Sequence, residues 1–202
     1  MLAVNSSLEK IIPTLEGWCT VDKAKKLARV IMEKHPKQCV EIGVFAGRSL
    51  IAMALALRAN NDGGIIHGID PWCAPAALEG KNSKENEEWW RKIDYDYFYK
   101  YTLNKIKEHG VAKHTTVIRE KSDVAVRRFD DASLDLVHID GNHSEQSSTL
   151  DVNLWAPKLK SGGIMVMDDT NWATVNKALA RLDELGFQLL EDNESWRMYV
   201  KK

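Results

Sequence analysis

The sequence predicts an α/β protein whose doubly wound sheet of about seven strands is mostly parallel and carries helices on both faces. Short β-favouring runs alternate with longer helical patterns along the chain, and this alternation is typical of a parallel sheet. A short polar segment separates the last two strand signals, which predicts an antiparallel hairpin at the C-terminus. The 202 residues contain no repeat or linker, so we expect a single domain over residues 1–202.

The first half of the chain contains two strong helix signals and three strand signals. Apolar residues recur at helical spacing between positions 22 and 33, and Asp22 is a suitable N-cap for that helix. Residues 47–60 are rich in alanine and leucine and are long enough for a second helix. The strands are expected at 39–44, at 65–70 after the Asp62-Gly-Gly turn signal and, more weakly, around Val117-Ile118.

The second half of the chain predicts the rest of the sheet. A β-favouring run ends at Asp140, and a second one follows the chain break at Ser161-Gly-Gly. The expected elements are strands at 134–140 and 164–168, a helix at 171–184, and strands at 187–191 and 196–200. Residues 1–37, which precede the first strand, are expected to form an N-terminal helical segment.

Charge, cysteine content and apolar runs disfavour nucleic-acid binding, secretion and membrane insertion. The 28 basic and 29 acidic residues nearly cancel, whereas proteins that bind nucleic acid usually carry a marked basic excess. The chain has an odd number of cysteines, Cys19, Cys39 and Cys73, and none of them shows CxxC spacing. We therefore expect free thiols in a reducing cytoplasm. The N-terminus lacks a secretory pattern, and the longest apolar run, 50–57, is shorter than the ~20 residues that span a bilayer. We therefore expect a cytoplasmic protein with neither nucleic acid nor membrane as a partner.

A glycine-containing loop follows the first strand. Gly43 and Gly47 lie four residues apart, and Phe45 stands where a dinucleotide-binding loop has the glycine that admits a pyrophosphate. A tight turn without a ligand would also explain both glycines. Glu41 within the strand needs a hydrogen-bond donor, from a ligand or from neighbouring backbone. Asp70, at the end of the second strand, is placed either to hold ribose hydroxyls or to cap the following turn.

Acidic residues end two further strands. Asp140 ends the fourth strand, and Asp168 and Asp169 end the fifth. Because ligands bind at the carboxyl ends of parallel strands, we expect the three carboxylates to converge. Such a cluster needs a cation, and oxygen ligands suit Mg²⁺, Ca²⁺ or Mn²⁺; helix or turn caps would explain one of these acids but not all three. His143 can accept a proton from a hydroxyl, but it would also fit a solvent-facing helix start or a further metal ligand.

These motifs resemble a known enzyme family. The pattern E-x-G-x-x-x-G after the first strand, with an acid ending the second, resembles class I S-adenosylmethionine-dependent methyltransferases over roughly residues 40–169. D-G-x-H after the fourth strand and G-G-x-x-x-x-D-D at the fifth resemble the small O-methyltransferases of the macrocin type and those grouped with cephalosporin-pathway enzymes. The resemblance implies a Rossmann-like fold and methyl transfer from S-adenosylmethionine to a hydroxyl of a small molecule, either sugar-like or phenol-like.

The resemblance also implies roles for individual residues. It places S-adenosylmethionine against Glu41, Gly43, Val44, Ala46, Gly47, Ser49, Asp70, Pro71, Trp72, Ser122 and Asp140. It places Mg²⁺ at Asp140, Asp168 and Asp169, and it makes His143 and Asp140 the catalytic pair, with His143 as the base.

Residues 71–101 form an insertion that is too long for a simple strand-to-helix connection. Its first part, 74–85, is expected as a loop, and its second part is rich in tryptophan and tyrosine. Trp90, Ile93, Tyr97 and Tyr101 fall at helical spacing, which a helix packed on the core would explain; Trp89, Tyr95 and Tyr99 are then left over. These aromatic residues suit a lid or acceptor wall, and they equally suit the interface of a homo-oligomer. The N-terminal segment can join the same wall.

Three other functions compete with this interpretation. An NAD(P)-linked oxidoreductase is disfavoured by Phe45 in the glycine loop. A nucleic-acid methyltransferase is disfavoured by the charge balance and by Asp140-Gly-Asn-His in place of an N/D-P-P motif. A non-catalytic S-adenosylmethionine or nucleoside binder, in which the acids are only structural, is the third alternative.

Overall fold

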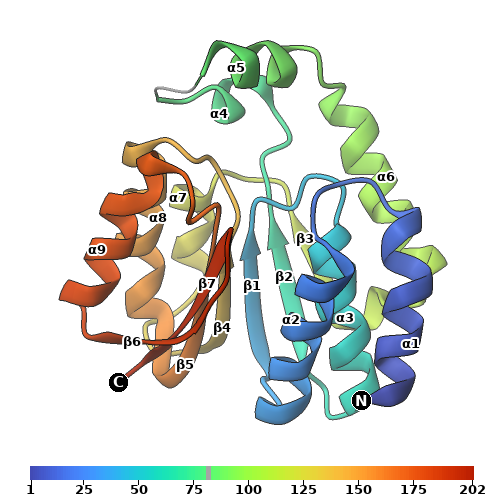
Figure 1. Ribbon diagram of the computed structural model, residues 1–202. Coiled ribbons are helices and arrows are strands. Elements are labelled where there is room, and N and C mark those ends of the chain that lie inside the picture. The colour runs from blue at the N-terminus through green and yellow to red at the C-terminus, as the bar shows by residue number, and fades with distance from the viewer. Residues whose placement is uncertain (81–82) are drawn as a thin grey trace.

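The computed structural model describes residues 1–80 and 83–202, and over these residues it shows a seven-stranded sheet in the order β3-β2-β1-β4-β5-β7-β6 (Figure 1). Strands β1 to β5 run parallel, and β7 pairs antiparallel with both β5 and β6. The predicted fold class is therefore confirmed, including the C-terminal hairpin. The strands are β1 (Gln38–Ile42), β2 (Ile65–Ile69), β3 (Thr115–Ile118), β4 (Leu134–Ile139), β5 (Leu159–Asp168), β6 (Phe187–Asp192) and β7 (Trp196–Lys201).

Helices cover both faces of this sheet (Figure 1). Successive strand residues enter different cores because side chains alternate along a strand: Cys39 packs with α1, α2 and α3, whereas Val40 packs with α8 and α9. The α-helices are α1 (Leu2–Ile11), α2 (Val21–Lys34), α3 (Arg48–Asn60), α4 (Ala74–Ala77), α5 (Lys84–Arg91), α6 (Tyr95–Glu108), α7 (Ser122–Ala125), α8 (Glu145–Trp155) and α9 (Asn176–Glu184). Short 3-10 turns occupy Ile12–Thr14, Ala112–His114, Val126–Arg128, Ala156–Lys158 and Ala173–Val175.

The strand order places a ligand site at the middle of the sheet. β1 pairs with β2 on one side and with β4 on the other, so the chain changes direction across the sheet at β1 and β4. Ligands of open α/β sheets bind at the carboxyl ends of the strands at such a switch point. Ile42 lies opposite Ile139 in this register, so the loops that follow β1 and β4 leave the sheet side by side.

Several elements differ in detail from the sequence prediction. Thr20, rather than Asp22, caps α2, because its hydroxyl accepts a hydrogen bond from the Lys23 N–H at 3.1 Å. β5 begins at Leu159 and not at 164, and its pairing with β4 shifts register between Leu134 and Leu136. The segment expected as a loop at 74–85 contains α4 and the start of α5, while its residues 81–82 lie outside the described residues. Across the described chain, we find no helix that is both long and apolar enough for a transmembrane span.

Candidate active site

A cavity of about 610 Å³ opens where the loops after β1, β2, β4 and β5 meet. The chain leaves the carboxyl end of β2 and continues into α4 and α5, which lie past that end of the sheet (Figure 1). The residues predicted for the site that line the cavity are Gly43, Val44, Ala46, Ser49, Asp70, Pro71, Trp72, Ser122, Asp140, His143, Asp168 and Asp169. Within the described chain, Glu41 and Gly47 are not among its lining residues. The strand ends therefore bring most of the predicted set into one cavity.

The glycine loop is held close to the loop after β4. Gly43 has a φ of +82°, and a Cβ atom placed on it would lie 2.0 Å from the Asp140 carbonyl oxygen. Only a residue without a side chain allows the two loops this approach. Phe45 also has a positive φ of 47°, a conformation that L side chains adopt at a cost.

Asp70 anchors this loop through its carboxylate. Oδ2 accepts hydrogen bonds from the backbone N–H groups of Val44 at 3.0 Å and Phe45 at 2.9 Å, and Oδ1 accepts one from Trp72 at 2.7 Å. Burial raises the pKa of Asp70, while the three N–H donors oppose that rise by stabilising the ionised form. The carboxylate both fixes the loop and faces the cavity; its contact with a ribose stays a prediction.

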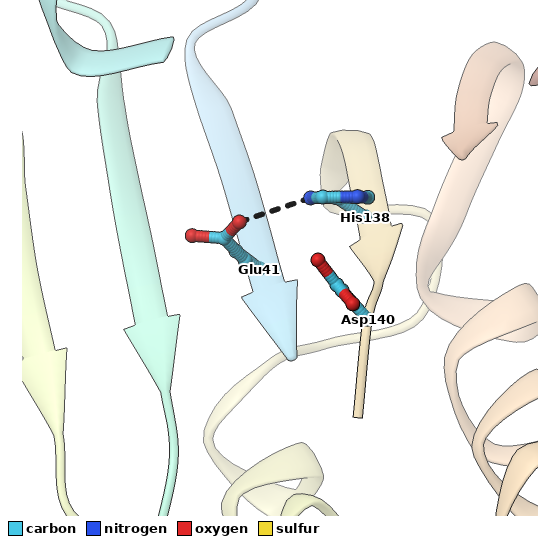
Figure 2. A group of neighbouring side chains, drawn as sticks. All are labelled: Glu41, His138 and Asp140. Atoms are coloured by element: carbon cyan, nitrogen blue, oxygen red, sulfur yellow. Dashed lines mark hydrogen bonds and ion pairs between the residues drawn. The ribbon is translucent and has the colours of Figure 1, made fainter. Parts of the chain in front are cut away.

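Glu41 points from β1 toward His138 of the neighbouring strand β4 and pairs with it (Figure 2). Its Oε1 atom is 3.0 Å from His138 Nδ1, and both side chains are fully buried. Burial raises the pKa of Glu41 to about 8 and lowers the pKa of His138 to about 3. The pair is therefore neutral near pH 7. The hydrogen-bond partner that Glu41 needs lies on the neighbouring strand, and the predicted contact of Glu41 with a cofactor stays a prediction.

The three acids converge as expected, but a lysine lies among them. One oxygen from each of Asp140, Asp168 and Asp169 lies within 4.8 Å of the others. Lys23 Nζ contacts Asp168 Oδ2 and is 3.8 Å from Asp140 Oδ2. The motifs of the sequence do not predict a lysine at this position. A usable signal existed, because Lys23 precedes Leu27 by four residues and so shares the apolar face of its helix.

His143 pairs with the remaining acid. Its Nε2 atom is 3.0 Å from Asp169 Oδ2, and its ring lies 5.1 Å from that of Trp172, measured between centroids. The side chain of His143 is partly exposed to the cavity. Asp169 is held in the left-handed backbone region, with a φ of 53°, and its N–H donates to Asp168 Oδ1 at 3.1 Å. The imidazole is thus oriented by a carboxylate and faces the cavity.

Asp140, Asp168 and Asp169 are the residues expected to bind a divalent ion. Carboxylate oxygens are ligands of the right kind for Mg²⁺. However, the Lys23 ammonium already contacts Asp168 and faces Asp140, and a divalent ion on the same oxygens would be repelled by it. With Lys23 in this position, the three acids do not fit a divalent ion.

Asp151, an acid absent from the sequence prediction, also lines the cavity. Ser122 Oγ donates a hydrogen bond to Asp151 Oδ1 at 2.5 Å, and both residues line the cavity. Asp151 is only 5% exposed, and burial raises its pKa to about 7. It lies on α8, and no motif in the sequence marks it, because its position depends on how that helix packs.

Aromatic residues from two separate segments form one wall of the cavity. Trp18, which follows the N-terminal helix, stacks on Phe45 with ring centroids 5.2 Å apart and meets Trp89 of α5 at 5.1 Å. Trp18, Trp89 and Trp90 all line the cavity. Arg48 holds the N-terminal segment in place by donating hydrogen bonds to the carbonyls of Ile12, at 2.9 Å, and Gly17. Both segments named in the sequence prediction therefore contribute to the cavity wall.

Comparisons with known proteins agree with this architecture. The family described as "Methyltransferase domain" matches residues 40–170. The methyltransferase PaMTH1 of Podospora anserina, solved with S-adenosylhomocysteine (SAH), is 14% identical; the match covers 98% of this chain and 88% of that one, with a TM-score of 0.68. The O-methyltransferase TomG of Streptomyces achromogenes, which is involved in tomaymycin synthesis and was solved with S-adenosylmethionine (SAM), is 16% identical, with 98% and 89% covered and a TM-score of 0.65. The O-methyltransferase NovP is 13% identical, with 92% and 83% covered and a TM-score of 0.71. At these identities the solved structures establish a shared fold.

Proposed function

The chain belongs to the methyltransferase family whose domain matches residues 40–170, and from this premise we propose that it transfers a methyl group from SAM to a hydroxyl of a small molecule. The observation that carries the proposal is that one cavity joins the glycine loop to the His143–Asp169 pair. TomG, which shares the fold, is an O-methyltransferase solved with SAM. We treat residues 1–202 as one catalytic domain.

The cofactor is proposed to lie between the glycine loop and the end of β2. There, Gly43 and Val44 would pass along its methionine part, Asp70 would accept from its ribose, and Ser122 with Asp151 would meet its adenine. All five residues line the cavity. The carboxylates at the strand ends favour a cofactor that carries a positive sulfonium.

The acceptor is proposed to lie against His143. With its Nε2–H donating to Asp169, the imidazole leaves Nδ1 free to accept the proton of the acceptor hydroxyl. Bound SAM would supply a methyl carbon on a positive sulfonium; the hydroxyl oxygen would bond to that carbon as the carbon–sulfur bond breaks, which would leave a neutral thioether. Because the sulfonium is already activated, the protein mainly positions the two partners and excludes water.

The cavity wall supports the proposed class of acceptor. Trp18, Trp89 and Trp172 offer flat apolar faces, which suit the ring of a sugar or a phenol. We propose that residues 71–101 act as a lid over this acceptor. The free thiols of the three cysteines fit the reducing compartment that the sequence predicts.

Magnesium assistance stays a prediction from the sequence. The three carboxylates converge as it requires, but the Lys23 ammonium lies among them. The mechanism proposed here therefore contains no metal step.

Two measurements test the proposed function. Calorimetry should detect SAH binding and no NAD⁺ binding, and a protein that does not bind SAH would refute the proposal. A screen of hydroxylated sugars and phenols, followed by release of SAH, should identify an acceptor; binding without transfer to any acceptor would favour the non-catalytic binder.

The role of His143 has its own test. His143→Asn should bind SAH normally but lose about 10²–10⁴-fold in transfer rate, which is the range for losing a general base. His35→Asn is the matched control, because His35 is exposed and pairs with Asp62 away from the cavity. Equal rates for the two variants would remove His143 from the mechanism.

A further inference from the structure

Lys23 is a buried lysine at the carboxyl ends of the strands. Its side chain is 7% exposed, whereas the side chains of Lys25 and Lys26 on the same helix are 30% and 26% exposed. Lysine is almost never fully buried unless its charge is paired. The pairing partners of Lys23 are Asp168, in direct contact, and Asp140, whose Oδ2 lies 3.8 Å from Nζ.

The backbone of α2 fixes where this ammonium points. The N–H of Lys23 donates to the Thr20 side chain at the start of α2, and the neighbouring Ala24 and Leu27 are completely buried. The position of Lys23 is therefore set by a capped and packed helical turn. Its side chain lines the cavity instead of extending into solvent.

Each of the three acids at this end of the sheet has a cationic or imidazole partner from the chain itself. Asp168 and Asp140 face Lys23, and Asp169 faces His143. A cluster of carboxylates needs positive charge to stay ionised, and here one ammonium supplies it. A hard divalent ion would need the same oxygens as its own ligands, so it and Lys23 compete for one position.

We propose that the Lys23 ammonium is the resident cation of this cluster: it holds Asp140 and Asp168 in place, and no divalent ion binds there. Lys23 is thus a positioning residue that acts through the two carboxylates. The statement about metal binding stands on the geometry alone. Its consequence for the reaction, methyl transfer that does not depend on a divalent ion, rests on the proposed function.

The test is a titration of the full-length protein with Mn²⁺, which substitutes for Mg²⁺ and whose free concentration is read by electron paramagnetic resonance. The wild-type protein should leave the Mn²⁺ signal unchanged. Lys23→Met removes the ammonium while nearly keeping the volume and leaves the two carboxylates without a cation, so it should bind Mn²⁺ and lower the free Mn²⁺ signal that the wild type leaves unchanged. The double variant Lys23→Met/Asp168→Asn should lose that binding.

Lys25→Met is the matched control, because Lys25 lies on the same helix and pairs with Glu9 outside the cavity. It should behave as the wild type does. Tight Mn²⁺ binding by the wild type, displaced by Mg²⁺, would overturn the proposal, and so would a folded Lys23→Met variant with no gain in Mn²⁺ affinity. If Lys23→Met does not fold, as judged by circular dichroism, the wild-type titration alone still tests whether a divalent ion binds at the cluster.

The reaction provides a second readout once an acceptor is known. Wild-type transfer should be unchanged in excess EDTA, and loss of activity in EDTA would overturn the metal-free reaction. Failure of the proposed function itself is recognised separately, because it would appear as absent SAH binding in calorimetry, whereas the Mn²⁺ titration requires no cofactor.

Discussion

Replacing Gly43 with alanine tests whether the close contact between two loops builds the site. The added Cβ would lie 2.0 Å from the Asp140 carbonyl oxygen, 2.5 Å from its carbonyl carbon and 2.7 Å from Gly141 Cα. All three are backbone atoms, so no side chain can rotate away, and the loops after β1 and β4 must separate. That movement displaces Asp140 and opens the cavity at its centre.

Two costs contribute to the expected loss of stability. Gly43 has a φ of +82°, and a left-handed conformation costs an L residue about 1–2 kcal/mol. Forcing extra volume into a packed site costs about 1–3 kcal/mol more. We therefore expect the free energy of unfolding to fall by about 2–5 kcal/mol, or the melting temperature by roughly 2–4 °C for each kcal/mol in a chain of this size.

Gly63→Ala separates these two costs. Gly63 has nearly the same φ, +83°, but a Cβ on it would have no heavy atom within 4 Å. It therefore carries the backbone cost alone. Urea unfolding of both variants, together with SAH calorimetry, compares them directly. If Gly43→Ala were no less stable than Gly63→Ala and bound SAH with wild-type affinity, the argument from loop contact would be refuted.

Two further predictions concern buried acids and pH. Glu41, with a pKa of about 8, stays protonated in the folded protein but ionises in the unfolded chain. Its contribution to stability is complete below its ordinary pKa and disappears as pH rises through about 8. Between pH 6.5 and 8 the wild type should therefore lose roughly 1–2 kcal/mol relative to Glu41→Gln in urea unfolding; parallel pH profiles for the two proteins would contradict this. Asp151 has a pKa of about 7, so its contribution to stability is also lost as pH rises, at a lower pH than that of Glu41. Between pH 5 and 8 we expect Asp151→Asn to gain roughly 2–3 kcal/mol over the wild type, and a difference that does not vary with pH would show that Asp151 is ionised throughout.

The fold and the gathering of the acids could be predicted from sequence because both follow from strand order. Asp140 and Asp168 end adjacent parallel strands, and residues at strand ends meet whatever the details of packing. The partner of Glu41 could not be predicted in the same way. Glu41 and His138 lie opposite each other in the pairing of β1 with β4, and this register depends on both strands packing between two helical layers.

Lys23 and Asp151 were missed for a related reason. Both lie on helices, and a helical side chain reaches the cavity only if its helix docks at the right height and rotation. For Lys23, the four-residue spacing to Leu27 indicates a lysine on a buried face, but it does not say which acid it meets. For Asp151, even that signal is lacking, because α8 places polar Ser148 and Asp151 beside apolar Val152 on its buried side.

The protonation of Glu41 and the position of Lys23 together determine the charge of the site. If Glu41 were ionised, Lys23 would face a fourth carboxylate, and one ammonium could not balance the group. Burial keeps Glu41 protonated and His138 neutral, so the neutral pair lies beneath the cluster and adds no charge to it. Lys23 then offsets part of the charge on Asp140 and Asp168, and the remaining negative charge faces the cavity. A cationic sulfonium would be attracted to such a cavity and a neutral thioether would not. The charge arrangement in which we propose Lys23 as the resident cation would therefore also favour release of the product.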